Sequence, residues 1–258
     1  MPRSRLQRLW SGYGGYALGF ISLVVIWHVA AVYLVGSVLF PPPVVVYRKA
    51  VVLIRNGVLF EHLSASIQRI LAGFVAGSLL GIPIGLVMGS FRPARKFLEP
   101  YTEFLRFIPA VAMITVAVIW FGIGEASKIF LIIYTTIFIV ILNTAAGVSA
   151  IAPNKIRAAE ALGATRAQIF CHVALPATVP YILTGMRLAM ANSFTTIVAA
   201  ELIAANEGLG KMLWDGRMFM LVDDIFVSLV ALGLLGFVVD RMFRWSIYAF
   251  AGKYSPAT

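Results

Sequence analysis

Residues 153–180 read PNKIRAAEALGATRAQIFCHVALPATVP, and this stretch is the most informative part of the sequence about the fold. This stretch lies between two apolar segments that are each long enough to cross a bilayer. It is not itself a plausible crossing, because it carries several charged side chains and prolines interrupt its second half. The pattern therefore predicts a compact helical hairpin between two membrane spans, where it can dock against another protein.

Local signals place the two helices of this hairpin. We expect Asn154 to cap the first helix and Gly163 to form the turn after it, because glycine takes a positive φ without steric cost. Thr165 and Gln168 have the spacing of a capping box, so a second helix should start directly after Thr165. Pro176 lacks an amide proton, and we expect it to end that helix.

Composition places the whole chain in the membrane. Of its 258 residues, 60% are hydrophobic and only 12% are charged, and the mean hydropathy is +0.91. Soluble domains are nearer half apolar and a quarter charged. The formal net charge of +10 comes from basic residues spread over the loops, which indicates membrane topology and not a nucleic-acid partner. A single cysteine excludes an internal disulfide, and no His/Cys cluster has metal-ligand spacing.

The apolar segments predict an all-α integral membrane protein with about six spans. We expect these spans at about 16–35, 70–91, 100–124, 129–154, 180–204 and 225–245. A further helix at 44–66 mixes apolar and charged residues, and we expect it to lie on the outer surface. Basic residues are more numerous in the segments that this topology places inside. We therefore expect both termini and residues 153–180 to be cytoplasmic.

Small residues recur at a fixed interval in the second expected span. Its glycines follow one another every four residues, at Gly73, Gly77, Gly81, Gly85 and Gly89. This spacing puts them on one helical face, so we expect another helix to pack closely against that face.

The hairpin also carries a pattern that spans both of its helices. Permease subunits of ATP-binding-cassette (ABC) importers have a cytoplasmic loop that reads Glu-Ala-Ala, three residues, Gly, nine residues, Ile or Val, one residue, Leu-Pro. Residues 157–176 resemble this pattern at every position except the first, where an arginine replaces the glutamate. A carboxylate follows three residues later. The residues of this coupling pattern are Arg157, Ala158, Ala159, Glu160, Gly163, Val173, Leu175 and Pro176.

Other stretches, at 39–43, 66–74, 105–109 and 120–124, resemble the taurine, aliphatic sulfonate and nitrate branch of these binding-protein-dependent permeases. The resemblance implies a type I importer (MetI-like) fold with a coupling-helix loop at 153–180. It implies one permease domain over 1–258, with its core at about 62–250. It also implies a homodimer in a bacterial inner membrane, with two ATPase subunits and an extracytoplasmic substrate-binding protein. The ATPase subunits would bind ATP and Mg, so we expect no cofactor in this chain.

The fifth expected span is the most informative chemically, and it supplies the candidate pathway residues Arg187, Asn192, Thr196 and Glu201. An arginine in a bilayer helix is costly, so it should face protein or water. Three roles are open to Arg187: an ion pair with Glu103 or Glu201, attraction of an anionic cargo, or anchoring of helix packing. Two interpretations are open for Glu201, which lies near the outer end of the span: a pathway residue, or a wet interfacial carboxylate without a transport role.

The sequence has no nucleotide-binding motif, metal constellation or catalytic-triad spacing, so we expect a non-catalytic membrane subunit. By resemblance, such a permease forms the pathway for a small, anionic solute and couples it to ATP hydrolysis by its partner. A secondary transporter driven by an ion gradient is the alternative, although no internal repeat is evident. An intramembrane enzyme that uses His28, Arg187 and Glu201 is less favoured, because these residues form no motif.

Overall fold

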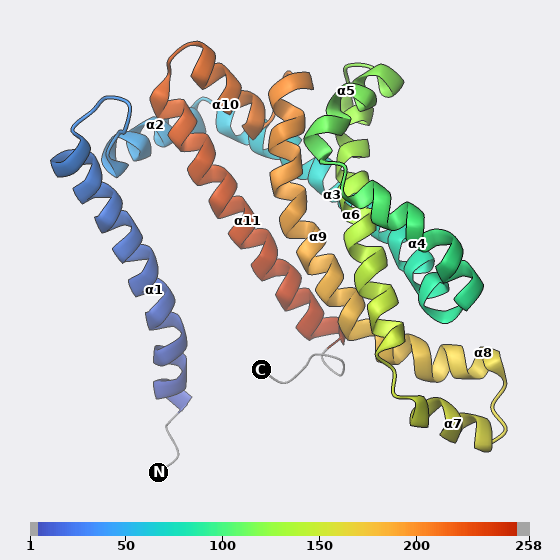
Figure 1. Ribbon diagram of the computed structural model, residues 1–258. Coiled ribbons are helices and arrows are strands. Elements are labelled where there is room, and N and C mark those ends of the chain that lie inside the picture. The colour runs from blue at the N-terminus through green and yellow to red at the C-terminus, as the bar shows by residue number, and fades with distance from the viewer. Residues whose placement is uncertain (1–4, 252–258) are drawn as a thin grey trace. The chain divides into compact units, whose positions relative to one another are not determined.

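A computed structural model describes residues 5–251, with the side chains of 14–202 and 205–247, and over these ranges the chain contains helices and no β-strand (Figure 1). The helices are α1 (Arg5–Val29), α2 (Pro43–Arg55), α3 (Val58–Ser90), α4 (Arg92–Arg106), α5 (Ala110–Phe121), α6 (Glu125–Ser149), α7 (Pro153–Ala161), α8 (Arg166–Ile169), α9 (Leu175–Ala204), α10 (Leu209–Met218) and α11 (Val222–Ala251). One π-helical segment, Ala30–Val35, follows α1, and a second, Phe170–Ala174, follows α8. The prediction of an all-α protein is confirmed.

Several helices have the length and apolar composition of membrane spans. In the described part of the chain, five continuous segments qualify: Gly14–Val35, Val58–Ser90, Glu125–Ser149, Arg166–Leu202 and Val222–Ile247. The pair α4 and α5 qualifies as one broken span with a bend of 99°. Counting this pair gives six spans, in agreement with the predicted number.

The third span is not the single helix that we predicted at 100–124. α4 ends at Arg106, and α5 begins directly after Pro109, whose backbone is extended with φ −62° and ψ 140°. Proline has no amide proton to donate, and it disfavours helical geometry in the residue before it. The break in the span therefore follows from Pro109.

The segment predicted as one surface helix at 44–66 is also divided differently. α2 ends at Arg55, and Gly57 has a φ of +78° before α3 begins at Val58. α3 then continues for 33 residues to Ser90. The second span thus has no separate start at residue 70, and its first turns include polar residues of the segment predicted as a surface helix.

The turn and the second cap of the hairpin are confirmed. Gly163 has a φ of +79°, a left-handed conformation that favours glycine. The Thr165 hydroxyl accepts a hydrogen bond from the backbone amide of Gln168 at 3.3 Å. The side-chain oxygen of Gln168 accepts one from the backbone amide of Thr165 at 2.8 Å. These interactions are local, which is why the sequence predicts them correctly.

The two other expectations for the hairpin are wrong. Asn154 is not the cap of α7, because Pro153 already occupies the first turn of the helix. Pro176 does not end the second helix but lies in the first turn of α9, which follows α8 without interruption through the π-helical segment.

The helices form two compact units. The first comprises Met1–Phe60 and Met212–Val230. Within it, the ring of Phe226 lies 5.8 Å from Trp27 and 5.7 Å from Phe40 between centroids, so α11 begins against aromatic side chains from the N-terminal part of the chain. The single permease domain expected over 1–258 stays a prediction.

The second unit comprises Glu61–Lys211 and Ala231–Thr258. In this unit α6 packs along α9, and the hairpin of α7 and α8 extends from their shared end (Figure 1). Its hydrophobic core contains the buried side chains Ile70, Phe74, Ile132, Val140, Ala189, Met190, Ile197 and Val239.

The glycine stripe of α3 (Gly73, Gly77, Gly81, Gly85 and Gly89) lies against α6 in the same unit. A Cβ at Gly77 would lie 2.8 Å from Thr136, and a Cβ at Gly85 would lie 2.6 Å from Thr144. The other three glycines meet Ile132, Val140 and Val148 in the same way. The predicted close approach of another helix is therefore confirmed, and that helix is α6.

Candidate functional site

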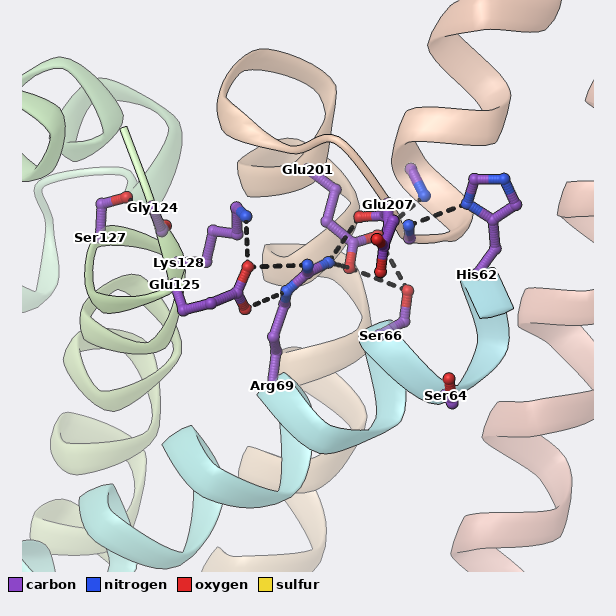
Figure 2. Close-up of polar contacts among 12 residues, drawn as sticks. His62, Ser64, Ser66, Arg69, Gly124, Glu125, Ser127, Lys128, Glu201 and Glu207 are labelled. Atoms are coloured by element: carbon purple, nitrogen blue, oxygen red, sulfur yellow. Dashed lines mark hydrogen bonds and ion pairs between the residues drawn. The ribbon is translucent and has the colours of Figure 1, made fainter. Parts of the chain in front are cut away.

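Oppositely charged side chains of the second unit meet near the start of α3, the start of α6 and the end of α9 (Figure 2). Arg69 donates through Nη1 to Glu201 Oε1 at 2.7 Å, and Glu201 is fully buried. Arg69 also donates to both carboxylate oxygens of Glu125, at 2.5 and 2.8 Å. Lys128 completes this charge cluster with a 2.7 Å contact to Glu125.

The charge cluster is balanced, because two cations face two anions. An unpaired charge removed from water costs several kcal/mol, and removal of one partner of a buried pair costs about 3–5 kcal/mol. Arg69 uses all three of its guanidinium nitrogens in the cluster, which fixes three helices relative to one another. The charge cluster therefore has a structural role, because it joins α3, α6 and α9.

The loop after α9 closes over the Glu201 carboxylate. Ser66 Oγ lies 2.8 Å from Glu201 Oε1 and accepts the Leu209 amide at 2.9 Å. The Gly210 amide donates to Glu201 Oε2 at 2.9 Å. Gly208 has a φ of +126°, and a Cβ there would collide with the same carboxylate. Only glycine fits this position, so the loop covers the carboxylate and excludes water from it.

The interpretation of Glu201 as a wet interfacial carboxylate is therefore wrong, and so is its proposed pairing with Arg187. Neither the pairing of Arg69 with Glu201 nor that of Arg69 with Glu125 was among the expectations from the sequence. A signal existed, because Arg69 is a lone charge beside the apolar run that begins at Ile70. The identity of its acidic partners depends on tertiary packing and could not be read from the sequence.

Arg187 belongs to a different ion pair. Its Nε lies 2.8 Å from Asp240 Oδ1 on α11, and Arg244 approaches Asp240 Oδ2 at 2.6 Å. Neither of the expected partners of Arg187, Glu103 or Glu201, is involved. Both sides of this pair are about half-exposed and line an open groove of about 570 Å³ between α9 and α11.

A second cavity, of about 490 Å³, lies among the α4–α5 break, α6 and α9. Asn192 and Thr196, two of the four pathway candidates, line it together with Thr195 from the same helix. Arg106, the last residue of α4, lies at this cavity, and its guanidinium carbon is 4.8 Å from the centre of the Phe107 ring. The cavity thus combines polar groups of α9 with one cation, and we call it the α5–α9 cavity.

Hydroxyl groups form part of the fixed wall of this cavity. Thr135 Oγ1 of α6 lies 3.2 Å from Thr196 Oγ1 of α9, which joins the two helices across the wall. The Tyr134 hydroxyl donates to the Leu105 carbonyl at 2.6 Å and so holds the end of α4 against α6. Of the predicted pathway residues, the structure brings Asn192 and Thr196 to this cavity and leaves Arg187 and Glu201 elsewhere.

The hairpin residues that carry the coupling pattern lie largely at the surface of the second unit. Arg157, Ala158, Glu160 and Gly163 are exposed, whereas Ala159, Val173, Leu175 and Pro176 are partly covered. A shallow groove of about 450 Å³ runs between α7 and α8, with Gly163 at its turn. Leu162 beside it is 88% exposed, which leaves an apolar side chain available for a partner.

A sequence profile described as "Binding-protein-dependent transport system inner membrane component" matches residues 77–252. A probable ABC transporter permease protein of Brucella melitensis is 43% identical over 209 residues, covering 81% of this chain and 85% of that protein. The taurine transport system permease protein TauC of Escherichia coli is 39% identical over 230 residues, covering 87% and 83%. A putative aliphatic sulfonates transport permease protein, SsuC of Bacillus subtilis, is 32% identical over 223 residues, covering 86% and 81%.

The fold is similar to a chain of the methionine ABC transporter MetNI, solved in inward-facing conformations. The TM-score is 0.60 at 20% identity, over 72% of this chain and 95% of that chain. This likeness supports the predicted MetI-like fold. The matched profile covers more than half of the chain, and the relatives match most of it. The chain therefore belongs to the family of binding-protein-dependent transport system inner membrane components, the permease subunits of ABC importers.

Proposed function

We propose that this chain forms the membrane pathway of an ABC importer for a small organic anion of the sulfonate class. The named relatives that support this substrate class transport taurine and aliphatic sulfonates. No cofactor is needed in this chain, because ATP and Mg would be bound by the partner ATPase subunits.

The proposed assembly is a homodimer of this chain with two ATPase subunits on the cytoplasmic face and a substrate-binding protein on the other. The hairpin at 153–180 would face the cytoplasm, together with both termini, in a bacterial inner membrane. The support for this orientation is the excess of basic residues in the segments placed inside, including Arg92, Arg95 and Lys96.

One observation carries the proposal: the hairpin is joined directly to the two helices that line the α5–α9 cavity. α8 runs into α9 through a π-helical segment, and only a short turn separates α6 from α7. A displacement of the hairpin by an ATPase subunit would therefore move α6 and α9. Such a displacement shifts the transporter between states only if the ATPase contacts the hairpin differently in each state.

Transport in proteoliposomes tests this function. The tagged full-length chain would be purified in a mild detergent together with the subunits that it retains, and reconstituted with its binding protein. We expect an ATPase to co-purify, and radiolabelled taurine or butanesulfonate to accumulate only when hydrolysable ATP reaches the ATPase side. Uptake by this chain alone, independent of ATP and abolished by ionophores, would support the secondary transporter instead.

Thiol labelling tests the orientation separately. Cys171→Ser removes the one native cysteine, and Leu162→Cys then places a single thiol at an exposed position of the hairpin. We expect a membrane-impermeant maleimide to label this thiol only after the membrane is opened. Labelling in intact spheroplasts would place the hairpin outside and contradict the proposal.

A further inference from the structure

The α5–α9 cavity is lined by hydrogen-bond donors that have no acceptor among the described side chains. We propose that it is a subsite for an alkanesulfonate or a similar organic oxyanion, with Arg106 as its charged partner. The inference rests on the proposed function, because it identifies where the anionic cargo is held within the pathway.

Arg106 differs from the arginines that serve the structure of the second unit. Arg69 is paired with Glu125 and Glu201, and Arg187 is paired with Asp240. Among the side chains that the structure describes, no acidic group pairs with Arg106. Its guanidinium carbon lies 4.8 Å from the centre of the Phe107 ring, a contact that leaves the positive charge unneutralised.

Two further donors at the cavity have no partner within the described side chains. The Asn192 amide and the Thr195 hydroxyl both line the cavity, and neither side chain takes part in a hydrogen bond there. By contrast, Thr135 and Thr196 are bonded to each other and to helix carbonyl oxygens. A guanidinium, an amide and a hydroxyl that line one cavity offer hydrogen-bond donors for the three oxygens of a sulfonate group.

The remaining wall suits the organic part of such an anion. Phe107, Val111, Phe138 and Leu142 line the same cavity with apolar surface. The volume of about 490 Å³ lies within the roughly 300–1,000 Å³ range of small-molecule sites. A purely inorganic anion would leave this apolar surface unused, so the lining favours an anion that carries a short alkyl chain.

The structural alternative is that Arg106 only compensates the carbonyl groups at the end of α4. A cation at a helix C-terminus contributes about 0.3–1 kcal/mol in this way. That role needs no ligand, and it predicts that an added anion changes nothing at the cavity. Binding measured at the cavity itself therefore separates the two roles.

Cysteine protection measures this binding without requiring transport. In the Cys171→Ser background, Val111→Cys introduces a thiol at an exposed position of the cavity wall, because Val111 is 61% exposed. Ile123→Cys is the matched control, since Ile123 is 81% exposed and does not line the cavity. The full-length chain with its retained subunits would be labelled by a neutral maleimide, with and without 1-butanesulfonate, and with butanesulfonamide as the uncharged analogue.

We expect butanesulfonate to slow labelling of Cys at 111 but not at 123, and butanesulfonamide to slow neither. Arg106→Gln should raise the butanesulfonate concentration needed for protection roughly 10- to 100-fold, as expected for loss of a charge-assisted hydrogen bond. Arg106→Lys should restore part of it. Arg92→Gln, a matched change at an exposed arginine at the start of α4, should leave protection unchanged.

Four outcomes would overturn the proposal. Equal protection by butanesulfonamide would show that charge is not recognised, and unchanged protection in Arg106→Gln would remove its charged partner. An anionic lipid headgroup offers the same chemistry, so labelling is repeated in detergent with and without phosphatidylglycerol. Protection by the lipid that butanesulfonate does not displace would assign the cavity to lipid. ATP-driven butanesulfonate uptake without cavity protection would refute the subsite alone, whereas cavity protection without ATP-driven uptake would refute only the proposed function.

Discussion

Arg69 and Glu201 lie 132 residues apart in the sequence and form an ion pair of 2.7 Å in which the carboxylate is fully buried. Glu201 also accepts hydrogen bonds from Ser66 and from the Gly210 amide. The pair therefore joins α3 to α9 and holds the following loop over both side chains. Its contribution to stability can be measured because a matched exposed glutamate stands nearby.

Glu201→Gln should destabilise the second unit by about 3–5 kcal/mol, because it leaves Arg69 buried beside only one carboxylate. Thermal unfolding in detergent measures the change. Glu207→Gln is the control, since Glu207 is exposed and contributes only its backbone carbonyl to Arg69, at 2.6 Å. Equal melting temperatures for Glu201→Gln and Glu207→Gln would contradict the importance of the ion pair.

The close contact of α3 and α6 predicts opposite effects of one substitution at two glycines. Gly85→Ala adds a methyl group 2.6 Å from Thr144 Cβ, and such overpacking costs about 1–3 kcal/mol. Gly233→Ala adds the same group where nothing lies within 4 Å, so improved helix propensity should make it neutral or stabilising by up to about 1 kcal/mol. Unfolding temperatures of the two variants, compared with the parent, decide whether the stripe is a packing surface.

Arg187→Gln should have little effect on stability or assembly. Its partner Asp240 keeps the contact with Arg244, and half-exposed ion pairs contribute only about 0–1 kcal/mol. Asp240→Asn removes both contacts at once and should be the more damaging change. Size-exclusion chromatography of the complex provides the measurement. Dissociation caused by Arg187→Gln but not by Asp240→Asn would show that Arg187 has another partner.

The hairpin turn predicts a difference between two replacements of Gly163. Gly163→Val places a β-branched residue at a φ of +79° and costs about 1–3 kcal/mol of local strain, so the hairpin should distort and ATP hydrolysis should lose its coupling to taurine uptake. Gly163→Asn should retain most coupling, because asparagine tolerates this conformation.

Ala161→Val serves as the control for the added bulk. Ala161 is exposed and helical, and it lies outside the groove between α7 and α8. The ratio of taurine imported to ATP hydrolysed is the measured quantity for all three variants. A normal ratio in Gly163→Val would contradict the coupling role proposed for the hairpin.

Features that depend on neighbouring residues can be read from the sequence. The turn at Gly163 and the capping box of Thr165 and Gln168 depend on neighbours within a few residues, so they are predicted correctly. The glycine stripe is predicted as a packing face because its period matches the helix, although its partner is not. Local spacing and periodicity thus predict helices, turns and faces.

Features that depend on distant residues could not be read in the same way. The position of Glu201 near a span end allows a wet carboxylate, but Ser66 and Arg69, more than a hundred residues earlier, bury it. Arg187 pairs with Asp240 on α11, 53 residues later in the sequence, and local spacing does not predict this partner. Pro176 lies in a helical stretch that continues from α8 through the π-helical segment into α9, so the proline alone does not mark a helix end.

The interlocked glycine stripe limits how the transporter can rearrange. Each of its five glycines receives a side chain of α6, so a shift by a single residue would force those side chains against α3 backbone. The next position that restores the fit lies four residues away, a translation of about 6 Å. We therefore expect α3 and α6 to move as one rigid body during the transport cycle. The hinges would then lie at chain interruptions such as residues 107–109.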